Sequence, residues 1–224
     1  MELQGSTVAR YGPIVTVSDG FLRPSAAGPA RTRDARRQAL DPSRDKAIAG
    51  AVFQVLAELG YRGLTMDEVA LAAGVGKGAI YRRWSSKADL LVSFLEAASD
   101  DAITVIDTGT LREDLLGLMT TMADILESPA GRATRALIGA SVDEPAIAVA
   151  YRRGPLACWD KTYAEVLSRA ADRGELSPGI CNSVAAQAGP AIFYERWFVR
   201  GERLDEQFAV AVVDEVMLPL LMAR

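Results

Sequence analysis

Histidine is absent from this 224-residue chain, and cysteine occurs only twice. Without histidine the chain has neither a histidine general base nor a histidine metal ligand. It also lacks a Gly-x-Ser-x-Gly motif, a P-loop and a dinucleotide-binding fingerprint. Neighbouring acids such as Glu113 and Asp114 are expected at helix ends or turns, as caps or solvated side chains. The sequence therefore predicts no enzyme, no metal site and no cofactor.

Long apolar runs are also missing. The apolar run at 14–17 is too short for a signal peptide, and the longest uncharged stretch, 176–194, contains two prolines and several polar residues. We therefore expect a cytoplasmic protein with no membrane partner. Cys158 and Cys181 lack CxxC spacing, so two buried free thiols are expected, with a redox switch as the alternative.

Charge is divided unevenly along the chain, whose net charge at pH 7 is −4. Residues 31–90 contain 11 basic and 7 acidic side chains, whereas residues 91–224 contain 12 basic and 20 acidic ones. This division is expected when one domain faces phosphate and the other does not, although a solvated surface alone also gives it.

The first 43 residues are rich in Gly, Pro, Ser, Ala and Arg and show no periodicity, which predicts a flexible arm. The arm ends in a basic segment that could enter a DNA minor groove. Its alternatives are a solvated linker or residues upstream of the true start codon. The basic residues are Arg31, Arg33, Arg36 and Arg37.

Residues 65–87 have the pattern of two short helices joined by a tight glycine turn. Thr65 and Glu68 have capping-box spacing, which predicts the start of the first helix. Gly74 can take the left-handed conformation that closes that helix and turns the chain. The second helix, 77–84, places Ile80 and Trp84 on its buried face. Its other side is expected to point largely outward and to suit a DNA groove, through Lys77, Gly78, Tyr81, Arg82 and Arg83.

A scaffold for these two helices is predicted on both sides of them. Residues 44–59 form an amphipathic helix, and Ser86 with Asp89 opens another over residues 86–95. Lys87 then lies in a first helical turn. There its ammonium and the free backbone N–H groups could hold a phosphate oxygen.

Residues 44–100 resemble the DNA-binding domain of the tetracycline-repressor-like (TetR) family of transcriptional regulators. The resemblance rests on Leu-Thr-Met-Asp-Glu-Val-Ala at 64–70, Ala-Gly-Val at 73–75, Lys-Gly-Ala-Ile-Tyr-Arg-Arg-Trp at 77–84 and Ser-Lys-Ala-Asp-Leu-Leu at 86–91.

The resemblance implies a role for each matching position. Lys77 and Gly78 are implied to approach bases, and Trp84 to lie in the core. Phosphate contacts are implied for Thr65, Tyr81 and Lys87. The chain departs from the family pattern where members often carry Ser or Thr, at Gly76 and Ala79. Base readout must then depend on DNA shape and on Lys77, Arg82 and Arg83.

The chain is predicted to be helical throughout from residue 91 onward, with no strand alternation. Helices are expected at 110–126, 131–140, 145–153, 155–174, 183–200 and 205–222. The predicted fold is all-α, with a three-helix DNA-binding domain at 44–100 and an effector-binding and dimerisation domain at 101–224. Residues 169–176 and Gly189-Pro190 also resemble a common C-terminal domain of the same family.

The last two predicted helices carry small and apolar residues at helical spacing, which suits a four-helix bundle with a twofold copy. Ordinary intrachain core is the alternative. The family resemblance implies dimerisation here, and a helix-turn-helix that binds two half-sites needs twofold symmetry. The predicted interface residues are Ala185, Ala188, Gly189, Ile192, Phe208, Val212, Val216 and Leu220.

The resemblance also implies an effector pocket in the C-terminal domain. Aromatic and sulfur-bearing side chains there suit an unidentified small apolar effector, although each side chain taken singly is more often plain core. The predicted lining residues are Met119, Met122, Tyr151, Trp159, Tyr163, Phe193 and Trp197.

These features predict a sequence-specific regulator of transcription. The favoured form is a ligand-responsive repressor that binds double-stranded, palindromic operator DNA as a homodimer. One alternative is an activator that uses the same helix-turn-helix, and the other is a helical adaptor that binds protein.

Overall fold

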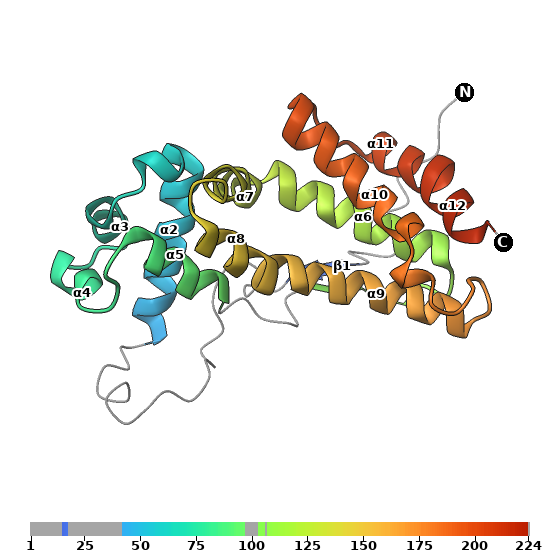
Figure 1. The fold of residues 1–224 in the computed structure, drawn as a ribbon, viewed down its shortest axis with the longest axis horizontal. Helices are drawn as coiled ribbons and strands as arrows, with labels where there is room; N and C mark the ends of the chain where they lie inside the picture. The colour runs from blue at the N-terminus through green and yellow to red at the C-terminus, as the bar shows by residue number, and fades with distance from the viewer. Residues whose placement is uncertain (1–14, 18–41, 97–102, 106, 224) are drawn as a thin grey trace, which may run out of the picture. The chain divides into compact units, whose positions relative to one another are not determined.

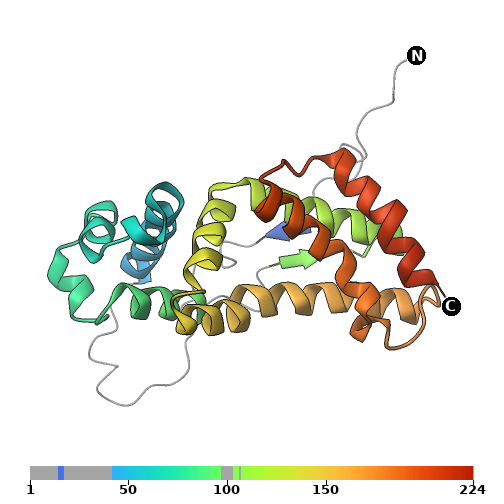
Figure 2. The same ribbon diagram turned by 45° about the horizontal axis from the view of Figure 1, so that its top comes forward.

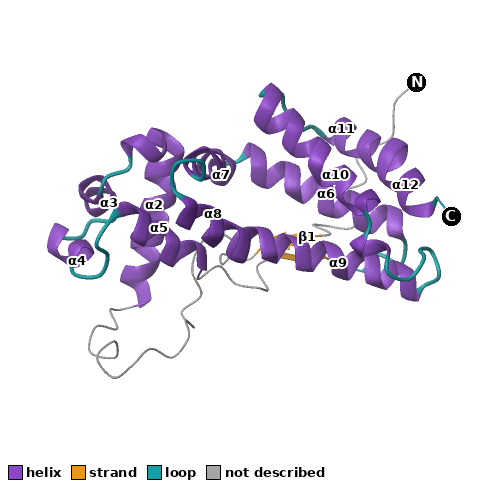
Figure 3. Cartoon of the chain, viewed as in Figure 1, coloured by secondary structure: helices purple, strands orange, loops and turns teal. Residues whose placement is uncertain are grey.

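The computed structural model describes residues 15–17, 42–96, 103–105 and 107–223. Nearly all secondary structure in these residues is helical, which confirms the predicted all-α fold (Figure 3). The chain divides into two compact units. The α2 unit comprises residues 18–102 and 128–158, and the α6 unit comprises residues 1–17, 103–127 and 159–224. The predicted arm, with its four arginines, lies almost wholly outside the described residues.

The α2 unit is a group of short helices around one long helix (Figure 1). Its elements are α2 (Pro42–Gly63), α3 (Met66–Ala72), α4 (Lys77–Tyr81), α5 (Lys87–Glu96), α7 (Pro129–Ala140), α8 (Pro145–Tyr151) and the π-helical turn η2 (Arg152–Leu156). The helical conformation of α2 is interrupted at Gly60, which has φ 67°. The first part of α2 therefore ends where the helix predicted at 44–59 ends.

Helices α7 and α8 pack within the α2 unit, although both follow residue 100 in the chain. Helix α7 packs on α2, and α8 packs on α5. Leu137 of α7 and Ile147 of α8 are therefore buried in the same core as Ile48 and Leu90. Their periodicity predicted an apolar face but did not specify which helix covers that face.

The α6 unit contains most of the C-terminal half of the chain. Its elements are β1 (Val15–Val17), β2 (Ile103–Val105), α6 (Leu111–Glu127), nearly all of α9 (Ala157–Asp172), the 3₁₀ turn η3 (Ile180–Asn182), α10 (Val184–Tyr194), η4 (Glu195–Arg200), α11 (Glu206–Ala211), η5 (Val212–Met217) and α12 (Leu218–Met222). Figures 1 and 2 show α10 beside the final helical segment, and α10 packs on η5 and α12. Helix α6 packs on α11 and η5.

One pair of short strands was not predicted. Strands β1 and β2 pair antiparallel, with Val15 opposite Val105 and Val17 opposite Ile103. Each strand has three residues, which is too few to produce a recognisable alternation of apolar and polar residues. Helix α6 packs on both strands.

The chain continues as a helix through Pro155, where the sequence predicted a break. A new helix was expected after Pro155, but α8, η2 and α9 run without interruption from Pro145 to Asp172. Proline has no N–H and cannot complete the ordinary α-helical ladder, so the wider π turn accommodates Pro155. The segments η4 and η5 are further π-helical turns that continue α10 and α11.

Three further observations concern the described residues. None of their helices combines the length and apolar character that a membrane span needs. No group of acidic and cysteine side chains among them could hold a metal ion. Cys158 is buried, but Cys181 is exposed in η3, so the expectation of burial is wrong for Cys181.

Candidate nucleic-acid interface

Local capping interactions set the angle between α3 and α4. The hydroxyl of Thr65 accepts a hydrogen bond from the Glu68 N–H at 3.1 Å, as the capping pattern predicted. Gly74 has φ 64°, and its N–H bonds to the Leu71 carbonyl at 3.1 Å. These contacts define both ends of α3 and confirm the predicted glycine turn.

Helix α4 is shorter than predicted, but its helical hydrogen bonding continues. The backbone N–H groups of Arg83 and Trp84 both bond to the Ile80 carbonyl, at 2.9 and 3.1 Å. Ile80 and Trp84 are buried, as expected. The Trp84 indole N–H donates to the Ser93 hydroxyl at 2.7 Å, and its ring lies 5.5 Å from that of Phe94. This anchor attaches α4 to α5 and leaves the opposite side of α4 at the surface.

Lys77, Tyr81 and Arg82 lie on that exposed side. The Lys77 ammonium donates to the Asp67 carboxylate at 2.5 Å, and the Tyr81 hydroxyl lies 3.5 Å from the other oxygen of Asp67. The hydrogen bond to Asp67 raises the pKa of Lys77, so the side chain stays charged. Within the described part of the chain, Arg82 makes no side-chain hydrogen bond or ion pair.

Arg83 was expected to point largely outward, and this orientation is wrong. Its guanidinium donates from both terminal nitrogens to the Asp45 carboxylate on α2, and it lies 4.4 Å from the centre of the Trp84 ring. Only 25% of the Arg83 side chain is exposed. Arg83 therefore joins α4 to α2, because a carboxylate on the long helix is within its reach.

Lys87 begins α5 as predicted, but its ammonium already has a protein partner. It donates to the Tyr61 carbonyl at 2.8 Å and lies 4.1 Å from the centre of the Tyr61 ring. The Ser86 hydroxyl accepts from the Asp89 N–H at 3.1 Å, and the Asp89 carboxylate accepts from the Ser85 N–H at 2.9 Å. The start of α5 is thus firmly capped, and the phosphate contact of Lys87 stays a prediction.

These elements place cations and hydroxyl groups together at the surface of the α2 unit. Gly78 adds no side chain to this surface, although a Cβ there would lie 3.2 Å from Arg82. Lys and Arg bind phosphates and guanine edges, and Tyr and Thr hydroxyls bind phosphates. The groups involved are Thr65, Lys77, Tyr81, Arg82 and Lys87.

The sequence analysis missed the two carboxylates that organise this surface. Asp67 lies ten residues before Lys77, and Asp45 lies 38 residues before Arg83. An acidic residue in a first helical turn is visible in the sequence and would ordinarily be explained by the helix dipole. Its cationic partner depends on the crossing of two helices, which no local pattern encodes.

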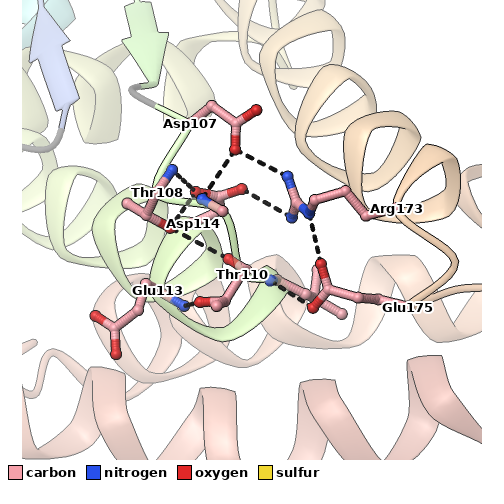
Figure 4. Close-up of polar contacts among 9 residues, drawn as sticks. Asp107, Thr108, Thr110, Glu113, Asp114, Arg173 and Glu175 are labelled. Atoms are coloured by element: carbon pink, nitrogen blue, oxygen red, sulfur yellow. Dashed lines mark hydrogen bonds and ion pairs between the residues drawn. The ribbon is translucent and has the colours of Figure 1, made fainter.

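A second polar cluster lies in the α6 unit, around Arg173 (Figure 4). The guanidinium donates to Asp107 at 2.9 Å, to Asp114 at 3.2 Å and to Glu175 at 2.6 Å. Asp114 is fully buried and also accepts from the Thr108 N–H and hydroxyl, at 2.8 and 2.6 Å. Asp114 lies in the first turn of α6, as expected, but its complete burial shows that the expectation of a solvated side chain is wrong. Its partner Thr108 lies in the loop before α6. Its partner Arg173 lies in the turn after α9, 59 residues after Asp114 in the chain.

The predicted effector residues are divided between the two units. Tyr151 belongs to the α2 unit and is half-buried, whereas the other six belong to the α6 unit and are buried. Those six are Met119, Met122, Trp159, Tyr163, Phe193 and Trp197. The indole N–H of Trp159 and the hydroxyl of Tyr163 are buried without a hydrogen-bond partner in the structure. Burial raises the pKa of Tyr163, so its hydroxyl keeps its proton.

The predicted interface residues differ in exposure. Gly189 and Val212 are buried within the chain, as the alternative of an ordinary intrachain core predicts for them. A Cβ on Gly189 would collide with the Met217 side chain, so this glycine permits close packing of α10 on η5. Leu220 is 45% exposed. The remaining five are half-buried: Ala185, Ala188, Ile192, Phe208 and Val216.

Comparison with known proteins identifies the family. Residues 48–94 match the model for bacterial regulatory proteins of the tetR family, and residues 105–216 match that for the tetracyclin repressor-like C-terminal domain. The chain belongs to the TetR family. It is accordingly a transcriptional regulator with a helix-turn-helix DNA-binding domain.

Relatives and solved structures agree with this assignment. The chain is 32% identical over 181 residues to the DNA-binding transcriptional repressor TetR of Mycobacteroides abscessus, covering 80% of this chain and 94% of the relative. The crystal structure of the TetR-family regulator SCO0332 is 30% identical, with a TM-score of 0.60, and the match covers 79% and 97% of the two chains. The Bacillus subtilis regulator FadR, solved in complex with stearoyl-CoA, shares the fold at 17% identity, with a TM-score of 0.56 and coverage of 80% and 98%.

Proposed function

We propose that this TetR-family regulator is a repressor that binds a palindromic operator as a homodimer and leaves it when an effector binds. The observation that carries the proposal is the exposed side of α4, where Lys77, Tyr81 and Arg82 lie together while Trp84 anchors the helix from behind. A short exposed helix with two cations and a phenol fits the major groove.

Dimerisation is supported by the apolar surface near the C-terminus. Val184 is 83% exposed and Leu220 is 45% exposed, at the start of α10 and in α12. These two helices pack on each other within the chain, so they present one continuous surface to a second copy. A twofold pair places two α4 helices on successive major grooves if they are roughly 34 to 36 Å apart.

An effector is supported by the two unpartnered donors in the α6 unit. Trp159 and Tyr163 are four residues apart on α9, so their side chains lie on the same face of that helix. A buried donor without an acceptor is unfavourable by about 1 to 3 kcal/mol. An effector that combines an apolar chain with a carbonyl or carboxylate oxygen would satisfy these donors, and the stearoyl thioester of stearoyl-CoA, the ligand of the FadR complex, has both features.

The proposal predicts that Lys77 and Lys87 affect DNA binding differently. Lys77→Ala should weaken binding to the operator by roughly 5- to 150-fold per half-site and change binding to random DNA little, because a base contact carries sequence information. Lys87→Ala should weaken binding to both, and should reduce the log–log salt slope by about 0.9 for each phosphate that the variant no longer neutralises. Fluorescence anisotropy over a salt series measures both effects on duplexes selected from the gene's own upstream region.

Arg203→Ala is the control, because Arg203 is exposed and belongs to the α6 unit. It removes the same charge without changing the helix-turn-helix, so operator affinity should stay close to that of the unmodified protein. Equal losses for Lys77→Ala on operator and random duplexes would make Lys77 a phosphate contact. If the unmodified protein prefers none of the selected duplexes to random DNA, the proposed function is wrong.

A further inference from the structure

One carboxylate contacts two of the side chains through which α4 is proposed to bind DNA. Asp67 lies in the first turn of α3, and its two oxygens lie 2.5 Å from the Lys77 ammonium and 3.5 Å from the Tyr81 hydroxyl. The first distance is that of a short charge-assisted hydrogen bond, and the second is at the limit of hydrogen bonding. Asp67 therefore occupies, within the protein, donors that would otherwise bind DNA.

The position of this ion pair makes it exchangeable. The side chains of Lys77 and Asp67 are 66% and 46% exposed, so water and salt screen their attraction. The neighbouring Arg83–Asp45 pair is different, because its side chains are only 25% and 34% exposed and the guanidinium stacks on Trp84. Arg83 is thus fixed in the fold, whereas Lys77 can leave Asp67 at little cost.

A carboxylate and a phosphate offer Lys77 the same chemistry, which is an oxygen anion that accepts charge-assisted hydrogen bonds. DNA that attracts the helix through phosphate charge alone must displace Asp67 and must also overcome repulsion by its negative charge. Operator DNA adds base-edge contacts that random DNA lacks. An internal anion at this position therefore weakens binding to any DNA whose contacts separate Lys77 from Asp67.

We propose that Asp67 restrains DNA binding, because it occupies Lys77 and Tyr81 in the free protein and both donors must leave it before they contact DNA. The inference rests on the proposed function, in which α4 binds DNA. It adds that the free protein presents a partly neutralised helix, and that Lys77 exchanges Asp67 for DNA when the operator is bound.

The matched variants are Asp67→Asn and Glu68→Gln. Both remove one negative charge from the first turn of α3 with little change in side-chain shape, but only Asp67 contacts Lys77. We expect Asp67→Asn to tighten binding to a random-sequence duplex by roughly 2- to 20-fold for a dimer with two such pairs. Its salt dependence should also become steeper, by about 0.9 for each additional phosphate neutralised. Glu68→Gln should change both quantities less, and operator affinity should rise at least as much as random-duplex affinity, because Lys77 leaves Asp67 in the operator complex.

Anisotropy measurements on both duplexes decide between this proposal and simpler explanations. If Asp67→Asn and Glu68→Gln tighten random binding equally, Asp67 acts only through its charge near DNA and the proposal is wrong. If Asp67→Asn weakens binding to both duplexes, Asp67 positions Lys77 for contact with DNA, which also overturns it. In a Lys77→Ala background, Asp67→Asn should have no effect beyond that of Glu68→Gln.

A measurement without DNA tests the pair itself. The chain has four lysines, so the Lys77 side chain can be assigned by NMR and its pKa followed by titration. The hydrogen bond to Asp67 raises the pKa of Lys77, and Asp67→Asn should lower it toward the ordinary value of about 10.4. An unchanged pKa would mean that the pair does not form in solution. If the unmodified protein prefers the operator but these Asp67 effects are missing, this inference fails while the proposed function stands.

Discussion

Arg173 in the α6 unit and Lys77 in the α2 unit both bind carboxylates, but the surroundings of those carboxylates differ. Arg173 bonds to three acidic side chains, and one of them, Asp114, is fully buried and also accepts two hydrogen bonds from Thr108. Lys77 bonds to Asp67 at the surface, where both side chains are exposed to water. Similar ion-pair chemistry thus occurs in a closed network and in an open pair.

The difference indicates which charged groups hold the fold and which remain available to a ligand. Removal of Asp114 from the network takes an acceptor from Arg173 and from Thr108, at a site where the carboxylate itself is fully buried. Removal of an exposed carboxylate leaves a lysine that water solvates at once. We therefore assign the Arg173 cluster to the stability of the α6 unit and the Lys77 pair to DNA binding.

The largest expected effect is that of Asp114→Ala. It removes one of the three carboxylates that Arg173 contacts and the acceptor of both Thr108 donors, so we expect the free energy of unfolding to fall by about 1 to 3 kcal/mol. Urea unfolding followed by tryptophan fluorescence measures this loss, since Trp159 and Trp197 both belong to the α6 unit.

Glu113→Ala is the matched control for this experiment. Glu113 precedes Asp114 in the same helical turn, but its carboxylate pairs only with Arg112, at 3.2 Å and near the surface. We expect a loss below about 1 kcal/mol. Similar losses for both variants would show that the network around Arg173 adds nothing beyond an ordinary surface pair, and the comparison with Lys77 would lose its basis.

A smaller effect is expected at Arg83, whose ion pair is intermediate between the two extremes. Arg83→Ala removes a half-buried ion pair and a cation–π contact with Trp84, so the free energy of unfolding should fall by about 1 kcal/mol. Arg82→Ala is the control, because Arg82 is exposed and should change stability by less than about 0.5 kcal/mol while weakening DNA binding. If Arg83→Ala instead leaves stability unchanged and weakens DNA binding as much as Arg82→Ala does, Arg83 faces DNA as the sequence predicted.

Features set by neighbouring residues were predicted well. The cap at Thr65, the left-handed Gly74 and the Ser86–Asp89 cap all depend on contacts within four residues, and the structure has each of them. The buried positions of Ile80 and Trp84 follow equally directly from helical spacing. The predicted helix-turn-helix therefore agrees closely with the observed one.

Features set by the packing of distant segments were not predicted. Asp45 and Arg83 are separated by 38 residues, and Asp114 and Arg173 by 59, so neither pair follows from periodicity. The same limit applies to α7, because its amphipathic pattern does not identify α2 as the helix on which it packs. For the side chains that we propose bind DNA, the residue types were readable from the sequence, but the carboxylates that pair with Lys77 and Arg83 depend on helix crossings.

The smallest expected effect is a pH dependence at the Asp214 carboxylate, which accepts two hydrogen bonds from Arg112 at 2.7 Å and links η5 to α6. Hydrogen bonding to Arg112 lowers the pKa of Asp214 in the folded protein. A carboxyl group with a lowered folded pKa stabilises the fold above its unfolded pKa of about 3.9, and this contribution is lost as pH falls through the folded value. Because Asp214 is partly exposed, Asp214→Asn should reduce the free energy of unfolding by less than about 1 kcal/mol at neutral pH, and the difference should shrink below about pH 4.

Glu215→Gln, an exposed neighbour, should show no such trend in urea unfolding across this pH range. A deficit in Asp214→Asn that persists at low pH would mean that the side chain acts through packing, and that even a bidentate pair at the surface adds little electrostatic stability.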